Sequence, residues 1–332
     1  MTVLRFSGLL RPIAGLALVP VLLLGPSTAA QATLAEDDDP EVVHHSVTVT
    51  DDADAAPDQR AVLDYWTPER MATATPVAAL LDDVSGRLPL TPGPRSHTSA
   101  PHPATSGSAE RWTGGGRVAE TTGKVFMTMH GRDLSCSASV VSAENAATVI
   151  SAGHCLKDGT GDWAERWVFV PGYAEGERPH GTFVARDLYV TGRWANDADD
   201  SADVGMAVLH PNDEDVAVAD AVGAQNITFS SPEVRHVHAF GFPADGRFDG
   251  EHLYFCSGQT TPDTRSTSAS GMACQMTRGS SGGPWLTDFD PETGRGSISS
   301  VISFKYADDP NTQYGPPLGT DVRRMHAQAE LR

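Results

Sequence analysis

The chain has 332 residues, with 24 Lys and Arg against 43 Asp and Glu, a formal net charge of -19 and 39% hydrophobic residues. This length suits one large domain or two of ordinary size. The acidic balance argues against a nucleic-acid partner, because binding to phosphates requires clustered Lys and Arg. Four cysteines are too few for a small disulfide scaffold, and none has the CxxC spacing of a structural zinc site.

Residues 1–32 have the pattern of a secretory signal peptide. Arg5 and Arg11 precede an uncharged apolar run over 12–25, and small residues follow up to Ala32. This run is short for a membrane span and contains Pro20, so a retained anchor is the weaker interpretation. We expect cleavage after Ala32, secretion to an extracellular compartment where disulfides persist, and no membrane partner once the signal is removed.

Residues 33–111 differ in composition from the rest of the chain. Acidic clusters at 36–39 and 51–58 are followed by a stretch over 88–108 that is rich in Pro, Ser, Thr and Gly. Such a segment buries little apolar surface, so we interpret it as a largely disordered acidic pro-segment and linker, which makes the protein a zymogen. A permanent disordered stalk is the alternative. A short helix is predicted within 61–81, interrupted at Pro68.

Residues 112–332 follow the pattern of an all-β domain. Short runs rich in β-branched and aromatic residues are separated by Gly, Pro, Asn or Asp, which predicts a sandwich or a barrel. The C-terminal stretch 321–331 is predicted to be helical. The expected strands are 125–129, 137–141, 147–151, 167–170, 183–185, 188–190, 205–209, 236–240 and 298–306.

Three small clusters in this region carry candidate chemistry. His154 follows the apolar strand 147–151 and precedes Cys155, an arrangement that alone would more often be structural or metal-binding. Asp203 stands directly before the apolar strand 205–209, where burial would require a partner such as a His N–H. Alone, it would usually face solvent at the end of a strand.

The third cluster is the sequence GSSGGP over residues 279–284. Glycines on both sides of Ser281 allow a sharp turn that exposes the hydroxyl and directs consecutive N–H groups at one point, as an oxyanion site requires. A flexible Ser/Gly linker would be the simpler interpretation of this hexapeptide by itself. Together with His154 and Asp203, however, it supplies a base, an orienting carboxylate and a nucleophile in the order His, Asp, Ser.

On the motifs SAGHC, DVGMAVL and GSSGGPW, the chain from residue 112 to 332 resembles the chymotrypsin-fold (trypsin-like) serine proteases, in particular the secreted bacterial glutamyl-endopeptidase-like branch. The resemblance implies two six-stranded antiparallel β-barrels with the active site between them. The first barrel would supply His154 and Asp203, and the second would supply Ser281. We expect a C-terminal helix after the second barrel.

The resemblance also implies a role for each site residue. His154, oriented by Asp203, would activate Ser281 to attack a peptide carbonyl, with the N–H groups of Gly279 and Ser281 as the oxyanion hole. Ser303 would hydrogen-bond Asp203 and present its backbone to an extended peptide. The candidate substrate-binding residues are Gln275, Ser303, Phe304 and Lys305.

The implied mechanism needs no metal and no organic cofactor, and the partners are protein or peptide substrates of a monomeric enzyme. Cys136 is expected to pair with Cys155, as in the family. Cys256 and Cys274 then remain as the second pair, which is one of three connectivities that four cysteines allow. Free buried thiols are the alternative, disfavoured in an exported protein.

Activation departs from the trypsin pattern. Ser280 precedes the nucleophile, where trypsin has an Asp that pairs with the new amino terminus. The bond between Arg117 and Val118 is a candidate processing site, but the trypsin ion pair cannot form from it. The hypothesis is that removal of the acidic segment at or near 113–118 relieves steric blockage or frees the amino terminus to pack elsewhere.

Specificity departs from two family patterns. Gln275 stands at the base of the primary pocket in place of the trypsin Asp, which disfavours preference for Arg or Lys. Ile302 occupies the position of a His that is typical of glutamate-specific relatives. Lys305 and Arg278 could attract an acidic substrate, although exposed long cations are usually solvated surface.

The acidic loop and the triad candidates also admit other interpretations. Asp197, Asp199 and Asp200 compete with Asp203 for the orienting role but stand in an acidic loop, as solvated charges or at most a weak cation site. A catalytically silent homologue acting as a binding protein remains the alternative function, although no triad residue is lost. An esterase with a GxSxG elbow is disfavoured by the order of the three residues and by the lack of a βαβ pattern.

Overall fold

The computed structural model describes residues 42–47, 55–77, 107–229 and 235–332. The predicted signal peptide, its cleavage point after Ala32 and most of the predicted linker lie outside these residues. No helix among the described residues is long and apolar enough to cross a membrane.

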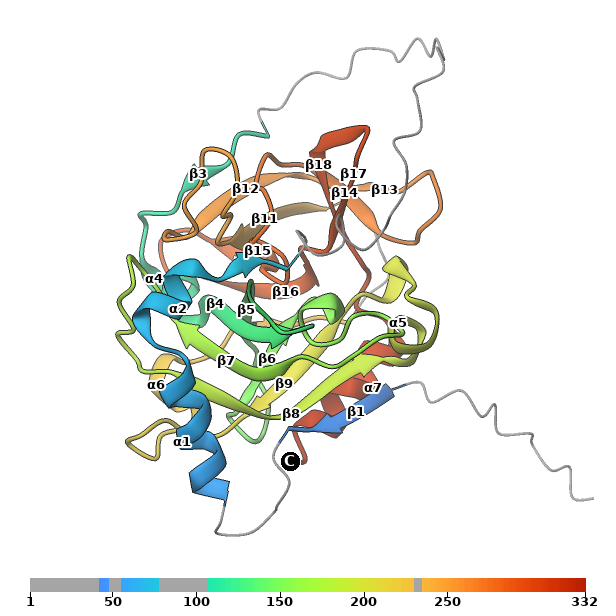
Figure 1. Cartoon of the computed structure of the whole chain (residues 1–332). Helices are drawn as coiled ribbons and strands as arrows, with labels where there is room; N and C mark the ends of the chain where they lie inside the picture. The colour runs from blue at the N-terminus through green and yellow to red at the C-terminus, as the bar shows by residue number, and fades with distance from the viewer. Residues whose placement is uncertain (1–41, 48–54, 78–106, 230–234) are drawn as a thin grey trace, which may run out of the picture. The chain divides into compact units, whose positions relative to one another are not determined.

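Six strands close into an antiparallel barrel, shown in green and yellow in Figure 1. The strand order is β8-β7-β4-β5-β6-β9, and β9 pairs back with β8. The β4–β5 hairpin turns through His130 and Gly131, whose positive φ angles of 52° and 71° suit a tight two-residue turn. The bounds are β4 (Thr122–Met129), β5 (Arg132–Val140), β6 (Thr148–Ser151), β7 (Glu165–Pro171), β8 (Phe183–Thr191) and β9 (Gly205–Leu209).

The second half of the chain, orange and red in Figure 1, forms two sheets together with the teal strand β3, instead of the second closed barrel that we expected. The first has the order β10-β16-β15-β11-β12-β3, and the second has the order β13-β14-β18-β17. They remain neighbours because only Thr260 separates β12 from β13 in the chain. The bounds are β3 (Glu110–Arg111), β10 (Asn226–Ile227), β11 (His236–Gly241), β12 (Tyr254–Gln259), β13 (Thr261–Pro262), β14 (Ser270–Ala273), β15 (Pro284–Asp290), β16 (Arg295–Val301), β17 (Phe304–Tyr306) and β18 (Asp309–Gly315).

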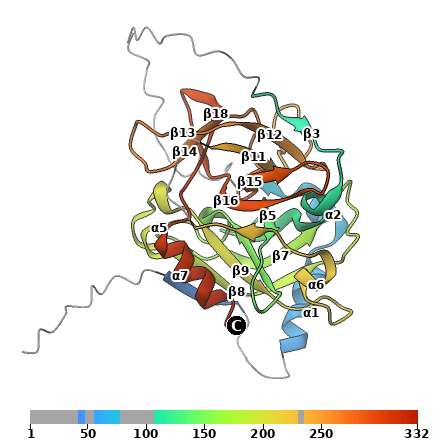
Figure 2. The same cartoon turned by 180° about the vertical axis from the view of Figure 1, so that it is seen from behind.

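The C-terminal helix α7 (Thr320–Ala329) packs beside the first barrel, as Figure 2 shows from behind. Val322, Met325 and Ala329 are buried on the face it turns to β8 and β9. This spacing is the helical period that predicted the element. The shorter helical elements are α4 (Gly116–Thr121), α5 (Gly192–Asp197), α6 (Val218–Val222), η1 (Gly153–Cys155) and η2 (Asp200–Ala202).

Parts of the segment that we expected to be largely disordered are folded against the first barrel. Strand β1 (Val42–Ser46) pairs with β8, and the short strand β2 (Thr75–Pro76) pairs with β5. Between them, α1 (Ala55–Tyr65) ends before Pro68, and α2 (Pro68–Thr73) begins with Thr67 as its N-cap. Residues 42–47 and 55–77 are thus ordered parts of the segment that the sequence predicted to be largely disordered.

Strand β4 is buried along its whole length because both of its faces are covered. Val125 and Met127 point into the main core, whereas Phe126 belongs to a separate cluster that contains Trp66 of the N-terminal segment. Side chains alternate between the two faces of a strand, so a continuous apolar run requires cover on each side. The N-terminal segment supplies this cover outside the barrel.

Candidate active site

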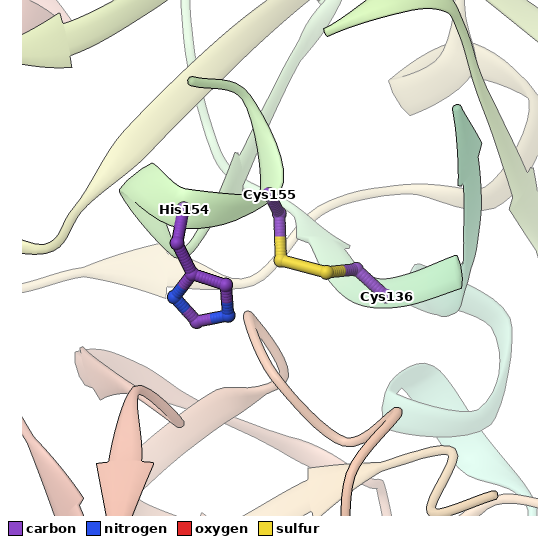
Figure 3. A group of neighbouring side chains, drawn as sticks. All are labelled: Cys136, His154 and Cys155. Atoms are coloured by element: carbon purple, nitrogen blue, oxygen red, sulfur yellow. A yellow bond between two sulfur atoms is a disulfide. The ribbon is translucent and has the colours of Figure 1, made fainter. Parts of the chain in front are cut away.

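His154 is held in a short turn directly after β6. This residue lies in η1, is 5% exposed, and is followed by Cys155, which forms a disulfide with Cys136 of β5. Figure 3 shows the imidazole ring beside this disulfide, projecting away from the turn that carries it. The Trp167 indole N–H donates to the Cys155 carbonyl at 3.0 Å, which fixes the turn from the neighbouring strand. The loop therefore presents His154 in one defined position.

The proximity of His154 to two sulfur atoms does not make a metal site. The candidate ligand atoms of Cys136, His154 and Cys155 lie within 4.8 Å of one another (Figure 3). Both sulfurs are consumed in the disulfide, and a metal requires the thiolate form of cysteine. The second disulfide joins Cys256 of β12 to Cys274, next to β14. These two pairs are the ones named from the sequence.

Asp203 is buried between η2 and β9 and is fully engaged in hydrogen bonds. Its Oδ1 accepts the backbone N–H of His154 at 2.7 Å, and its Oδ2 lies 2.7 Å from His154 Nδ1. The Ser303 hydroxyl donates to the same Oδ2. These bonds replace the water that burial removes, so a carboxylate is tolerated at 2% exposure.

His154 and Asp203 shift each other's pKa. Burial alone would lower the pKa of His154, but the carboxylate of Asp203 raises it above its ordinary value. Burial would raise the pKa of Asp203, but the imidazolium and the hydrogen bonds from His154 and Ser303 lower it below its ordinary value. The arrangement favours a protonated His154 beside an ionised Asp203, which is the pair formed when the histidine takes up a proton.

The loop that carries Ser281 has a backbone only glycine accepts at two positions. Gly279 and Gly282 have φ angles of +95° and +82°. A Cβ on Gly282 would lie 2.0 Å from the Ser151 hydroxyl, so a side chain has no room there. The glycines that were predicted to form the turn around Ser281 therefore also let this loop approach the first barrel closely.

Ser137 on β5 holds this loop from the opposite half of the molecule. Its backbone N–H donates to the Ser281 carbonyl at 2.7 Å, and its hydroxyl donates to the Gly279 carbonyl at 2.9 Å. The hydroxyl also accepts the backbone N–H of Phe242 at 3.0 Å. The carbonyls on either side of Ser280 are thereby fixed. Among the described residues, the backbone N–H groups of Gly279 and Ser281 donate to no backbone carbonyl.

All the candidate substrate-binding residues lie around one cavity of about 490 Å³, together with the side chains of His154, Asp203 and Ser281. Strand β17, which begins directly after Ser303, is the last strand in its sheet and offers an edge beside the cavity. The four candidates that line it are Gln275, Ser303, Phe304 and Lys305.

Lys305 places its ammonium group next to the base of this cavity. Its Nζ donates to the Cys274 carbonyl at 2.5 Å and to the Pro310 carbonyl at 2.8 Å. An ammonium has three N–H donors, so these two bonds leave one. Burial lowers the pKa of Lys305 to about 8, although Asp309 opposes the shift. Contrary to the simpler expectation, Lys305 is not a fully solvated surface cation.

Asp199 and Asp200, which compete for the orienting role, have other partners than the His154 ring nitrogens. Asp199 caps η2 by accepting the Ser201 N–H and pairs with Arg193, and Asp200 lines the outer part of the cavity. Desolvation and the nearby Asp203 raise the pKa of Asp200. Neither makes the hydrogen bonds to the imidazole that Asp203 makes.

The candidate processing bond after Arg117 is inaccessible in this fold. Arg117 and Val118 lie within α4, Val118 is fully buried, and the Arg117 guanidinium donates to the Val222 carbonyl. Proteases cleave extended, exposed chain, so this conformation does not present the bond. Upstream, Trp112 packs edge-on against Phe240 and Phe255, and strand β3 pairs with β12.

Three supporting residues were not found from the sequence. Ser137 holds the Ser281 loop, Thr191 donates from its hydroxyl to the Ala202 carbonyl at 2.6 Å, and the Trp194 ring lies edge-on to His154 with centroids 6.3 Å apart. Each acts on a residue distant in the chain, so no local motif marks it. Ser137 is one of three buried serines that alternate along β5 with Cys136 and Ala138, so its sequence context does not single it out.

The solved structures that resemble this chain include serine proteases. A thermostable serine protease AL20 from an extremophilic microorganism is 36% identical with a TM-score of 0.61, over 65% of this chain and 99% of that one. The protease Anisep from Arthrobacter nicotinovorans is 35% identical with a TM-score of 0.61, over 64% of this chain and 96% of that one. A Glu endopeptidase shares the fold, with a TM-score of 0.55 at 18% identity, over 69% of this chain and 99% of that one.

No family model and no curated protein matches the chain. The likeness to the Glu endopeptidase is too distant to carry its specificity and shows the fold alone. The AL20 and Anisep structures, in contrast, are covered almost completely at more than a third identity. The closed barrel, the cleft and these similarities show that the chain belongs to the chymotrypsin-fold serine proteases.

Proposed function

We propose that this chain is a secreted serine endopeptidase in which His154, Asp203 and Ser281 form the catalytic triad. The observation that carries the proposal is the bond between His154 Nδ1 and Asp203 at 2.7 Å, in the cavity that Ser281 also lines. The implied N–H on Nδ1 leaves Nε2 free to act as a base. A serine hydroxyl is a weak nucleophile near neutral pH unless such a base takes its proton.

The reaction proceeds in two balanced steps. His154 takes the Ser281 proton as Oγ attacks the scissile carbonyl, and it then gives this proton to the leaving amine, so that an acyl-enzyme remains. Water, deprotonated by His154, attacks the ester, and the acid product leaves as the proton returns to Ser281. Asp203 stays ionised and stabilises the imidazolium throughout.

The oxyanion that forms in each step is stabilised by the backbone N–H groups of Gly279 and Ser281. Their lack of backbone acceptors among the described residues supports this role, and each such donor contributes about 3 kcal/mol in the transition state. The peptide adds as a strand along the edge of β17, next to Ser303. Main-chain hydrogen bonds would then place the scissile bond over Ser281.

We assign the substrate preference to acidic side chains through Lys305. Its ammonium donates to the carbonyl of Cys274, the residue before Gln275, and both Lys305 and Gln275 line the cavity. One donor of the ammonium is left for a carboxylate. A cleavage profile on a mixed peptide library should show enrichment of Asp or Glu before the scissile bond, lost in Lys305→Gln. Arg278→Gln, which alters the other cation of the cavity, should retain it. A profile without acidic enrichment in the wild type would remove this preference.

Secretion is proposed from the signal pattern of residues 1–32. Two disulfides among the described residues support an oxidising compartment. Amino-terminal sequencing of protein recovered from the culture medium tests this proposal, with Thr33 or a later residue expected at the start. A chain that begins at Met1 in the cell-associated fraction would contradict it.

The activity itself is tested by labelling the secreted protein with a fluorophosphonate probe and measuring its intact mass. We expect one adduct on the wild type and none on Ser281→Ala or His154→Ala. Ser280→Ala is the matched control, because its hydroxyl donates to the Thr277 carbonyl at 2.7 Å and should not react. A folded wild type that takes up no probe would instead favour a silent homologue that binds without cutting.

A further inference from the structure

Strand β1 completes the surroundings of a buried carboxylate on the first barrel. It pairs with β8 from Val42 opposite Thr191 to Ser46 opposite Asp187. His44 Nε2 lies 2.8 Å from Asp187 Oδ1, and the Ser46 hydroxyl donates to the same oxygen at 2.8 Å. Asp187 is only 3% exposed, so without β1 it would lose two of its polar partners.

The helical part of the segment contributes a second set of contacts. Trp66 is 1% exposed, its indole N–H donates to the Arg166 carbonyl at 2.6 Å, and its ring lies 5.7 Å from that of Phe126. Tyr65 and Arg70 both hydrogen-bond the carboxylate of Asp133, at 2.6 Å and 2.8 Å. A buried indole with its N–H satisfied is the usual mark of a stable docking contact.

Hydrogen bonds connect these contacts to the loops that carry Asp203 and Ser281, one bond in the first case and two in the second. Thr191, opposite Val42, donates to the carbonyl of Ala202, the residue before Asp203. On the other side, Phe242 packs in the Trp66 cluster and donates its N–H to Ser137, which holds the Gly279 carbonyl. The segment is therefore linked through β8 to the residue before Asp203, and through Phe242 and Ser137 to the loop that carries Ser281.

The segment does not obstruct the cleft. None of the described residues of 42–77 lines the cavity that contains His154 and Ser281. Only 65% of this chain suffices to cover 99% of the AL20 structure, so about a third of this chain has no equivalent there. The barrel-bound segment, defined as residues 42–47 and 55–77, is thus placed to support the protease and not to plug it.

We propose that the outer face of the first barrel, from the β8 edge to the Trp66 cluster, is a binding surface whose partner is the barrel-bound segment. The segment stays on the active protease, also when the chain is cut between residues 78 and 106. This inference goes beyond the proposed function, because binding of the segment can be measured whether or not Ser281 reacts.

The test uses the full secreted chain with a recognition sequence for a site-specific protease inserted after Pro92. After the cut, size-exclusion chromatography in native buffer and intact mass should show the two fragments eluting together in equal amounts. Fluorophosphonate labelling should proceed at the rate of the uncut chain. Separation of the fragments in native buffer, or faster labelling after they separate, would overturn the proposal.

Matched variants identify the contacts that hold the segment. Trp66→Ala and, separately, His44→Ala should release the cut fragment at least tenfold faster than the wild type. Arg60→Ala, an exposed position on α1, should not. His44→Ala keeps the test decisive if Trp66→Ala fails to fold. The same experiment on Ser281→Ala should give the same retention, which separates this inference from the catalytic one. Equal release from all variants would overturn the assigned surface.

Discussion

Ser303 and His154 share one oxygen atom, because the hydroxyl of the first and Nδ1 of the second both meet Oδ2 of Asp203. Ser303 and His154 are separated in sequence by about half the length of the chain. The shared oxygen therefore connects Ser303, directly before the proposed substrate-binding strand β17, to the histidine that would act as base. Ser303 therefore helps to set the position of the His154 ring through Asp203.

Removal of this hydroxyl should weaken catalysis without weakening binding. Ser303→Ala is expected to lower kcat about tenfold with little change in KM, because a hydrogen bond to a charged group contributes about 1.5–3 kcal/mol and part of the loss is recovered by relaxation. Steady-state kinetics on a peptide ester measures the split. Ser300→Ala is the control, since its hydroxyl donates to the Pro316 carbonyl instead. Equal losses in both variants would contradict the positioning role.

The pH dependence of labelling follows from the raised pKa of His154. The base must be neutral to accept a proton, so the rate should rise with pH through a value above the ordinary 6.5. In Asp203→Asn the opposing charge is gone and burial dominates, so the midpoint should fall below 6.5 while the rate drops about 10⁴-fold. Second-order labelling rates between pH 4 and 9 measure both effects. An unchanged midpoint in the variant would refute the coupling.

Acidic preference should fade at alkaline pH. Lys305 has its pKa lowered to about 8, so its charge is present below that value and is lost above it. The ratio of kcat/KM for a Glu peptide over the matching Gln peptide is expected to fall about tenfold between pH 7 and pH 9. In Lys305→Gln the ratio should be low and independent of pH. A ratio that stays constant in the wild type would show that another group reads the acidic side chain.

The two disulfides close loops of nearly equal length. Removing each in turn should therefore distinguish an effect on stability from an effect on activity. With sequence separations of 19 and 18, loss of either pair by double Cys→Ser substitution should lower the free energy of unfolding by about 3 kcal/mol. Only loss of the Cys136–Cys155 pair loosens the His154 turn, so only that variant should lose probe labelling, by at least tenfold. Chemical denaturation and labelling of the same samples measure both quantities. Equal labelling in the two variants would contradict a local role for the first disulfide.

Gly282→Ala should abolish labelling for a steric reason that can be isolated. The new Cβ would lie 2.0 Å from the Ser151 hydroxyl and 2.3 Å from the Ser137 carbonyl, and the loop must move to admit it. Gly246→Ala shares the positive φ but meets nothing within 4 Å, so it shows the backbone strain alone. Thermal unfolding and probe labelling should be nearly normal in the control. Normal labelling of Gly282→Ala would mean that the loop is not constrained by the first barrel.

The order of the motifs allowed much of the site to be predicted from the sequence. His154, Asp203 and Ser281 each stand beside a recognisable strand or glycine turn, and the structure places their side chains around one cavity. Ser137 and Thr191 could not be found in this way, because each acts through a contact with a distant carbonyl. Closure of the second barrel was expected from the resemblance alone, and its strands form two sheets.

The average composition of the N-terminal segment hides the few apolar residues that hold part of it on the barrel. Trp66 and Met71 are buried on the barrel although acidic and polar residues surround them in the chain. A stronger indication lay elsewhere, in the short apolar runs 125–127 of β4 and 167–170 of β7. Strands that are apolar on both faces need cover outside the barrel, and no helix in residues 112–332 was predicted to supply it there.

The position of Ser137 makes the two halves of the molecule interdependent. A single residue of the first barrel bonds the carbonyls on both sides of Ser280, which belongs to the second half. The halves cannot separate without breaking the bonds from Ser137 to the loop that carries Ser281. Heating should therefore give one cooperative transition in which fold and reactivity disappear together, with no intermediate that keeps one half native and the nucleophile active.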